Sequence, residues 1–190
     1  MPDESVRSEH RVCPWWLAYT FDNPLRRWLH KPEELFRGFV APGRTAVDIG
    51  CGMGYFTIGL ARMVGPDGRV IAVDLQKEML ARAGKRLEKA GMLSRVTLHQ
   101  CTQTSLGVKA SADFVLAFWM VHEAADRPAF LREVAGLMKP GAQFFVAEPR
   151  MHVSASDVQR TIELAREAGL EKTAEPKVGW SRAVVFRKKG

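Results

Sequence analysis

The sequence predicts an α/β fold: a doubly wound, mostly parallel sheet of seven strands with helices on both faces, preceded by an N-terminal helical arm. Two observations predict it. From about residue 44 onward, short apolar runs typical of buried strands alternate with amphipathic segments of helical period. The first apolar run also leads directly into a glycine-rich turn, and sheets of this kind bind ligands beyond the carboxyl ends of their strands.

The predicted elements follow one another in regular order. Short apolar runs predict strands at residues 45–49, 69–73, 96–100, 113–118 and 143–147. Helical spacing of apolar residues predicts helices at 55–64, at 76–90, from the cap Asp126 to Met138, and at 157–168. Turn and stop signals separate them, namely Gly65-Pro66-Asp67-Gly68, Gly91 and Lys139-Pro140-Gly141. Two short strands at 170–177 and 182–186, joined across Gly179-Trp180-Ser181, close the chain.

Residues 1–40 differ in composition from the rest of the chain. They hold three of the five tryptophans and one of the two tyrosines: Trp15, Trp16, Trp28 and Tyr19. Pro14, Pro24 and Pro32 divide them into short pieces. We expect residues 1–40 to form an aromatic arm or lid over the carboxyl edge of the sheet, and residues 41–190 to form the ligand-binding domain. The alternative, that these aromatics only pack the arm onto the core, stays open.

Length and composition exclude several classes of protein. The chain has 190 residues, of which 46% are hydrophobic and 26% charged, which is typical of a globular domain. No stretch approaches the roughly 20 apolar residues that a membrane helix needs, and the polar segment Met1–His10 does not resemble a signal peptide. Three widely spaced cysteines indicate no disulfide framework and no metal site. We therefore expect a cytoplasmic protein without membrane insertion.

The net charge of +7 is the one unusual property. It is compatible with a nucleic-acid partner, an acidic substrate or simply a soluble basic protein. The basic residues are spread over predicted helix faces and the C-terminus instead of alternating with aromatics in one motif. A nucleic-acid partner therefore stays open but is not favoured, and the oligomeric state, monomer or homodimer, is left undecided.

The glycine-rich turn follows Asp48 and has glycines at every second position: Gly50, Gly52 and Gly54. Such a turn lets a ligand approach the backbone closely. A dinucleotide-binding turn would need a further glycine at position 55, which is Tyr55, and the charge of Asp48 would repel a pyrophosphate. A ligand with an ammonium group would tolerate that carboxylate. S-adenosylmethionine carries an ammonium and a carboxylate but no phosphate.

An acidic residue, Asp74, ends the second predicted strand, 20 positions after Gly54. A carboxylate at this place can accept hydrogen bonds from both hydroxyls of a ribose. The alternative is that Asp74 has a structural role, as an acid at the start of a helix that interacts favourably with the helix dipole. Together, the turn and Asp74 predict a nucleoside ligand.

Four segments resemble class I S-adenosylmethionine-dependent methyltransferases. Residues 48–54 match their motif D-x-G-x-G-x-G, and VIAVDLQKEML (70–80) looks like their second motif. The segments DFVLAFWMVHEAAD (113–126) and LMKPGAQFFVAEP (137–149) look like their fourth strand and their fifth-strand region. The likeness is closest to the small-molecule branch that includes quinone-biosynthesis enzymes. It implies a Rossmann-like fold and methyl transfer from S-adenosylmethionine, with S-adenosylhomocysteine as the product.

The resemblance also implies residue roles. The turn would line the methionine part of the cofactor, Asp74 would hold the ribose, and the adenine would lie near Leu75, Met79, Thr102 and Gln103. Core packing is the alternative for Met79, and relatives often carry Asp where this chain has Thr102. The cofactor residues are then Asp48, Gly50, Cys51, Gly52, Gly54, Asp74, Leu75, Met79, Thr102, Gln103, Phe118 and, from the arm, Tyr19.

Methyl transfer is an in-line displacement in which the protein mainly positions the reactants. A base is needed only when the acceptor is protonated, and His122 and Glu148, after the fourth and fifth strands, are the candidates. A structural role for either stays open. Residues expected at the acceptor are Trp15, Trp16, Trp119, Glu123 and His152. The expected acceptor is a small molecule; an RNA- or protein-directed methyltransferase and a non-catalytic cofactor-binding module are the alternatives.

Overall fold

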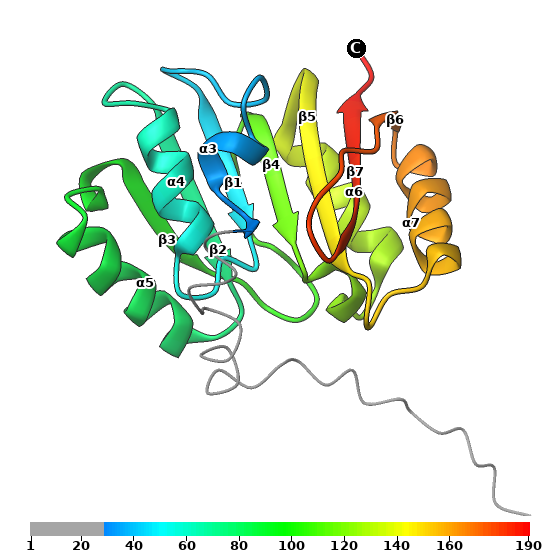
Figure 1. Ribbon diagram of the computed structural model, residues 1–190, viewed down its shortest axis with the longest axis horizontal. Coiled ribbons are helices and arrows are strands. Elements are labelled where there is room, and N and C mark those ends of the chain that lie inside the picture. Colours follow the sequence, from blue (N-terminus) through cyan, green and yellow to red (C-terminus); the bar gives the residue numbers. More distant parts are fainter. Residues whose placement is uncertain (1–28) are drawn as a thin grey trace, which may run out of the picture.

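One sheet of seven strands organises the computed structural model, which describes residues 29–190. The strands lie in the order β3-β2-β1-β4-β5-β7-β6, and β7 runs opposite to its neighbours (Figure 1). Strands β1 to β5 pair in parallel, as predicted. Their bounds are Thr45–Ile49 (β1), Arg69–Asp74 (β2), Val96–Gln100 (β3), Ala112–Phe118 (β4), Met138–Pro149 (β5), Leu170–Ala174 (β6) and Ser181–Lys188 (β7).

Helices cover both faces of the sheet, which confirms the doubly wound architecture (Figure 1). One face carries α3, α4 and α5, and the other carries α6 and α7. The helices are Pro32–Leu35 (α3), Tyr55–Met63 (α4), Lys77–Lys89 (α5), Arg127–Leu137 (α6) and Ala155–Glu167 (α7), with single turns at Leu93–Arg95 (η1) and Val121–Glu123 (η2). The side chain of Asp126 accepts from the N–H of Ala129 and caps α6, as its position predicted.

The start of β5 differs from the prediction. Lys139-Pro140-Gly141 was expected to separate the helix from a strand at 143–147, but β5 already begins at Met138, which pairs with Ala112. The register then shifts before Gln143. Since Pro140 has no N–H and disfavours helical backbone in the residue before it, the chain leaves the helix early and pairs through an irregular segment.

Part of the predicted arm belongs to the core. Phe36, just after α3, is completely buried and lies against the rings of Phe56, Phe114 and Phe145 at 5.3 to 5.6 Å between centroids. His30 reaches the carboxyl edge of the sheet. Tyr19, Trp15, Trp16 and Trp28 lie outside the described residues, so the lid and the boundary at residue 40 stay predictions.

Candidate functional site

The turn after β1 is built from glycines in left-handed backbone conformation. Gly50, Gly52 and Gly54 have φ angles of 70°, 53° and 78°. The N–H groups of Gly50 and Cys51 both donate to the carbonyl oxygen of Val73, at 2.8 and 3.0 Å. The first half of the turn is therefore held against β2. The N–H groups of Gly50 and Cys51 are therefore engaged within the protein.

Asp48 lies beneath this turn and is buried. The hydroxyl of Thr57, in the first turn of α4, donates to the Asp48 carboxylate at 2.6 Å. Thr57 is also buried, so the pair ties the end of β1 to the start of α4. A buried carboxylate without such donors would be costly, and Thr57 is a partner that the sequence analysis did not identify.

Asp74 joins the turn to the start of α5. One carboxylate oxygen accepts from Gly52 N at 2.8 Å, and the other accepts from Gln76 N at 2.9 Å. Burial raises the pKa of this carboxyl above its usual value, although the backbone N–H groups oppose the shift. An ionised carboxylate accepts about four hydrogen bonds, so each oxygen retains a position for a further donor such as a ribose hydroxyl.

The predicted adenine surroundings meet at the ends of β2 and β3. Gln100 donates to the carbonyl of Leu75 at 3.1 Å, and Met79 is buried in α5. The hydroxyl of Thr102 accepts from Ser105 N at 3.1 Å and thereby closes the exposed turn that also contains Gln103. The Thr102 side chain is thus already used locally.

The two cysteines of the described chain are free thiols beside this region. Burial raises the pKa of Cys51 well above its usual value, and burial together with the charge of Asp74 raises that of Cys101 to about 11. Both are therefore thiols and not thiolates near neutral pH.

Met120 covers the first glycine of the turn. A Cβ placed on Gly50 would lie 2.8 Å from Met120 Cγ and 2.9 Å from Met120 Cβ. Position 50 must be glycine for this contact as well as for its positive φ. No signal in the sequence pointed to Met120, because the contact joins two different loops at the carboxyl edge.

His122 and Glu148 form a hydrogen-bonded pair although 26 positions separate them. His122 Nδ1 lies 2.5 Å from Glu148 Oε2, and the other oxygen of Glu148 accepts from Val121 N at 2.8 Å. Glu148 is 3% exposed, whereas 26% of the His122 side chain is exposed. The carboxylate is therefore fixed and buried, and the imidazole reaches toward the outside.

The surroundings of His122 favour its charged form. Burial lowers its pKa, but the hydrogen bond and the charge of Glu148, aided by Glu123, outweigh burial, and the net pKa is raised above 6.5. Glu123 Oε1 lies 4.0 Å from Nε2, and the charge of Arg127 works in the opposite direction. Since a carboxylate only accepts hydrogen bonds, Nδ1 carries the proton and Nε2 of the neutral ring is the basic nitrogen.

Trp119 has a φ of 62°, which is uncommon for a residue with a large side chain. Its indole N–H donates to Ser181 Oγ at 2.8 Å, and its ring lies edge-on to His30 at 5.5 Å. Phe118 lies 5.5 Å from the same indole. Trp119, which was predicted to lie at the methyl acceptor, is therefore anchored to β7. Residues at the edge of the sheet hold its unusual backbone conformation in place.

The remaining predicted residue, His152, lies in the exposed loop after β5, where its N–H donates to the carbonyl of Pro149 at 3.1 Å. The structure thus gathers the turn and Asp74 on one side of the carboxyl edge, and His122, Glu123 and Glu148 on the other.

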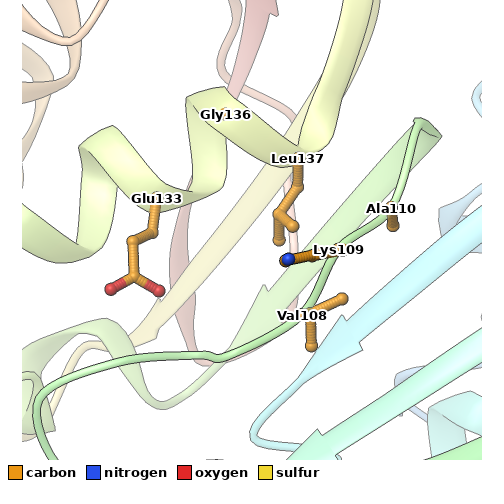
Figure 2. Close-up of a pocket in the computed structure, with 6 residues that line it drawn as sticks. All are labelled: Val108, Lys109, Ala110, Glu133, Gly136 and Leu137. Atoms are coloured by element: carbon orange, nitrogen blue, oxygen red, sulfur yellow. The ribbon is translucent and has the colours of Figure 1, made fainter.

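A pocket of about 330 Å³ lies away from this edge, between α6 and the loop before β4. Figure 2 shows that one wall comes from the helix and the other from the loop. Its lining residues are Val108, Lys109, Ala110, Glu133, Gly136 and Leu137. Because Ala110 precedes β4 and Leu137 ends α6, the pocket is at the opposite end of β4 from the candidate site.

Across residues 29–190, no His, Cys, Asp and Glu side chains gather into a group of three or more that could hold a metal ion. Within the same range, every helix is too short or too polar to cross a bilayer.

The sequence of the chain is similar to sequences of known methyltransferases. Residues 46–141 match the family model described as a methyltransferase domain. The demethylmenaquinone methyltransferase of Symbiobacterium thermophilum is 32% identical over 122 residues, which are 61% of this chain and 49% of that protein. The ubiquinone/menaquinone biosynthesis C-methyltransferase UbiE of Pasteurella multocida is 29% identical over 110 residues, 57% of this chain and 41% of that protein. The chain thus spans about half the length of the curated relatives it matches.

Solved structures share the fold. A SAM dependent methyltransferase from Aquifex aeolicus superimposes with a TM-score of 0.83 at 24% identity, covering 93% of this chain and 99% of that one. The cyclase SpnF superimposes with a TM-score of 0.70 at 16% identity, covering 82% of this chain and 80% of that one. These likenesses concern the fold alone, because different chemistry occurs on one architecture.

Proposed function

Because the chain belongs to the methyltransferase-domain family, we propose that it transfers a methyl group from S-adenosylmethionine to a small-molecule acceptor and releases S-adenosylhomocysteine. The observation that carries this proposal is the link between the glycine turn and Asp74. Gly52 N donates to Asp74 Oδ2 at 2.8 Å, so the turn and the buried carboxylate lie side by side at the carboxyl edge, where sheets of this kind bind their ligands.

The residues present fit this cofactor. Asp74 retains acceptor positions for the two ribose hydroxyls. In the turn, the space beside Gly52 is open, since a Cβ placed there would meet nothing within 4 Å, and the methionine part of the cofactor can approach the backbone at this glycine. Leu75 follows Asp74 directly and is the proposed neighbour of the adenine. When bound, S-adenosylmethionine supplies a methyl group already activated on a sulfonium. The protein then has to position the acceptor and, where the acceptor is protonated, remove its proton.

We assign that proton removal to Nε2 of His122. Glu148 accepts from Nδ1, which keeps the basic nitrogen on the far side of the ring, and its negative charge stabilises the imidazolium that forms. Glu148 is therefore a positioning residue that acts through His122. Nε2 receives the proton of the acceptor, and the carboxylate of Glu123 lies 4.0 Å from this nitrogen.

A small acceptor is supported by the relatives, whose names describe quinone-biosynthesis methyltransferases. A phenol-like hydroxyl or an activated carbon would need the base that His122 offers. Cofactor binding without turnover would leave this base without an assigned task. A cytoplasmic location stays a prediction, and the oligomeric state, monomer or homodimer, stays open.

Calorimetric titration with S-adenosylhomocysteine tests the cofactor site. Asp74→Ala removes two charge-assisted hydrogen bonds to the ribose, and we expect affinity to fall roughly 100-fold or more. The control is Asp67→Ala, which removes an exposed acid in the turn before β2 and should bind like the wild type. Since Asp74→Ala also leaves the N–H groups of Gly52 and Gln76 without this acceptor, melting curves must show that it is folded at the titration temperature. Equal affinity of a folded Asp74→Ala variant contradicts the proposed site.

Turnover is tested by following S-adenosylhomocysteine formation with quinols, phenols, amines, thiols and RNA. We expect wild-type product with a small molecule, and His122→Ala to slow it roughly 100-fold or more with unchanged cofactor affinity. Product with RNA alone, or cofactor binding without product, contradicts the proposed function.

A further inference from the structure

Arg182 lies directly opposite Glu148 in the sheet. The antiparallel register of β5 and β7 pairs these two residues. Residues directly opposite one another in an antiparallel pair project their side chains from the same face. Arg182 therefore shares the face of the sheet from which Glu148 contacts Val121 and His122.

The guanidinium of Arg182 has a donor that the described protein does not use. Its Nη1 is buried, yet no hydrogen-bond acceptor lies within reach of it among residues 29–190. Both oxygens of Glu148, the nearest carboxylate in the register, are already engaged by Val121 N and His122 Nδ1. Leaving a buried charged donor unpaired is costly, so an anionic oxygen that reached this guanidinium would be held strongly.

The chain beside Arg182 is basic and apolar. Arg150 donates from Nε to the carbonyl of Ser181, the neighbour of Arg182, at 3.0 Å. Trp180 and Met151 are 55% and 90% exposed. Arg150 N donates to Trp180 O at 2.9 Å, so Trp180 and Met151, the residue after Arg150, both lie near the start of β7. A guanidinium fork matches a carboxylate in shape. With exposed apolar side chains at the same end of β7, it suits a molecule that has an apolar body and a carboxylate.

We propose that Arg182 binds a carboxylate of the methyl acceptor, so that the acceptor is an aromatic or otherwise apolar carboxylic acid. This inference rests on the proposed function, because it names the substrate class of the same site. Arg182 selects the acid over its neutral analogues, and His122 removes a proton from the group that is methylated.

The test compares acids with their amides, which have nearly the same shape but no charge. Protein saturated with S-adenosylhomocysteine is titrated with 4-hydroxybenzoate and 4-hydroxybenzamide, and with 3-phenylpropionate and its amide. We expect the wild type to bind at least one acid more tightly than its amide. Arg182→Met should remove that preference, roughly 10- to 100-fold, with little change in amide binding. Arg182→Lys keeps the charge without the fork and should retain part of the preference.

The matched control is Arg187→Met on the same strand, since Arg187 is exposed and pairs with Gln143, farther from the candidate site. It should keep the wild-type preference. Equal or undetectable binding of acids and amides by the wild type overturns the assignment, as does an unchanged preference in a folded Arg182→Met or Arg182→Lys variant. Since cofactor affinity is measured first in every variant, a wild type that fails to bind S-adenosylhomocysteine is a failure of the proposed function instead.

Discussion

Replacing Glu148 by Gln tests the pair with His122 while preserving its shape. The amide oxygen of Glu148→Gln can still accept from Val121 N, but an NH₂ group then faces His122 Nδ1. Nδ1 must become the acceptor, so Nε2 carries the hydrogen and loses its basic lone pair. The variant therefore removes the negative charge and reverses the tautomer without creating a cavity.

The expected change in pKa has a definite sign. The wild-type His122 pKa is raised because Glu148 and Glu123 together outweigh burial. Without the charge of Glu148, burial dominates, and we expect the pKa of His122 to fall. A proton titration of the His122 ring by NMR measures it. Glu123→Gln is the control, since Glu123 lies 4.0 Å away and contributes less, so its fall should be smaller.

The unfolding free energy of Glu148→Gln should also fall, and by an amount that depends on pH. A histidine with a raised pKa stabilises the fold fully below its unfolded pKa of about 6.5, and this contribution is lost as pH rises through the folded value. A hydrogen bond to a charged group contributes about 1.5–3 kcal/mol, and partial exposure of His122 places the expected loss near the lower end. Urea unfolding of Glu148→Gln should thus show a larger deficit at pH 6 than at pH 9. An unchanged His122 titration in the variant would refute the reasoning.

Two further predictions concern the turn and the core. Gly50→Ala should lower the unfolding free energy by about 1–2 kcal/mol from its positive φ alone, and by more because Met120 must move. Gly91→Ala is the control: Gly91 has a φ of 67° and open space around it, so this variant measures the cost of the positive φ by itself. Urea midpoints that are equally shifted in the two variants would contradict the contact with Met120. Phe36→Ala should cost about 3–5 kcal/mol in the same assay, and a loss below about 1 kcal/mol would show that Phe36 is not part of the core.

Much of the fold could be predicted from local pattern. The strands β1 to β4 and the helices α4 and α5 begin and end within one or two residues of the apolar runs and glycine stops that predicted them. The start of β5 could not be predicted in this way, because pairing of Met138 with Ala112 outweighs the turn signal of Pro140 and Gly141. Hydrogen bonds to a neighbouring strand are a long-range effect that a local pattern does not contain.

The sequence by itself determined the strand–helix alternation, the glycine turn and the acid that ends β2, since these depend on backbone preferences of neighbouring residues. Only the tertiary structure decided that Glu148 meets His122, that Met120 covers Gly50 and that Arg182 stands opposite Glu148. Each of these contacts joins separate strands or loops. Which residues meet there depends on the order and register of the strands, and burial of the whole sheet selects that register.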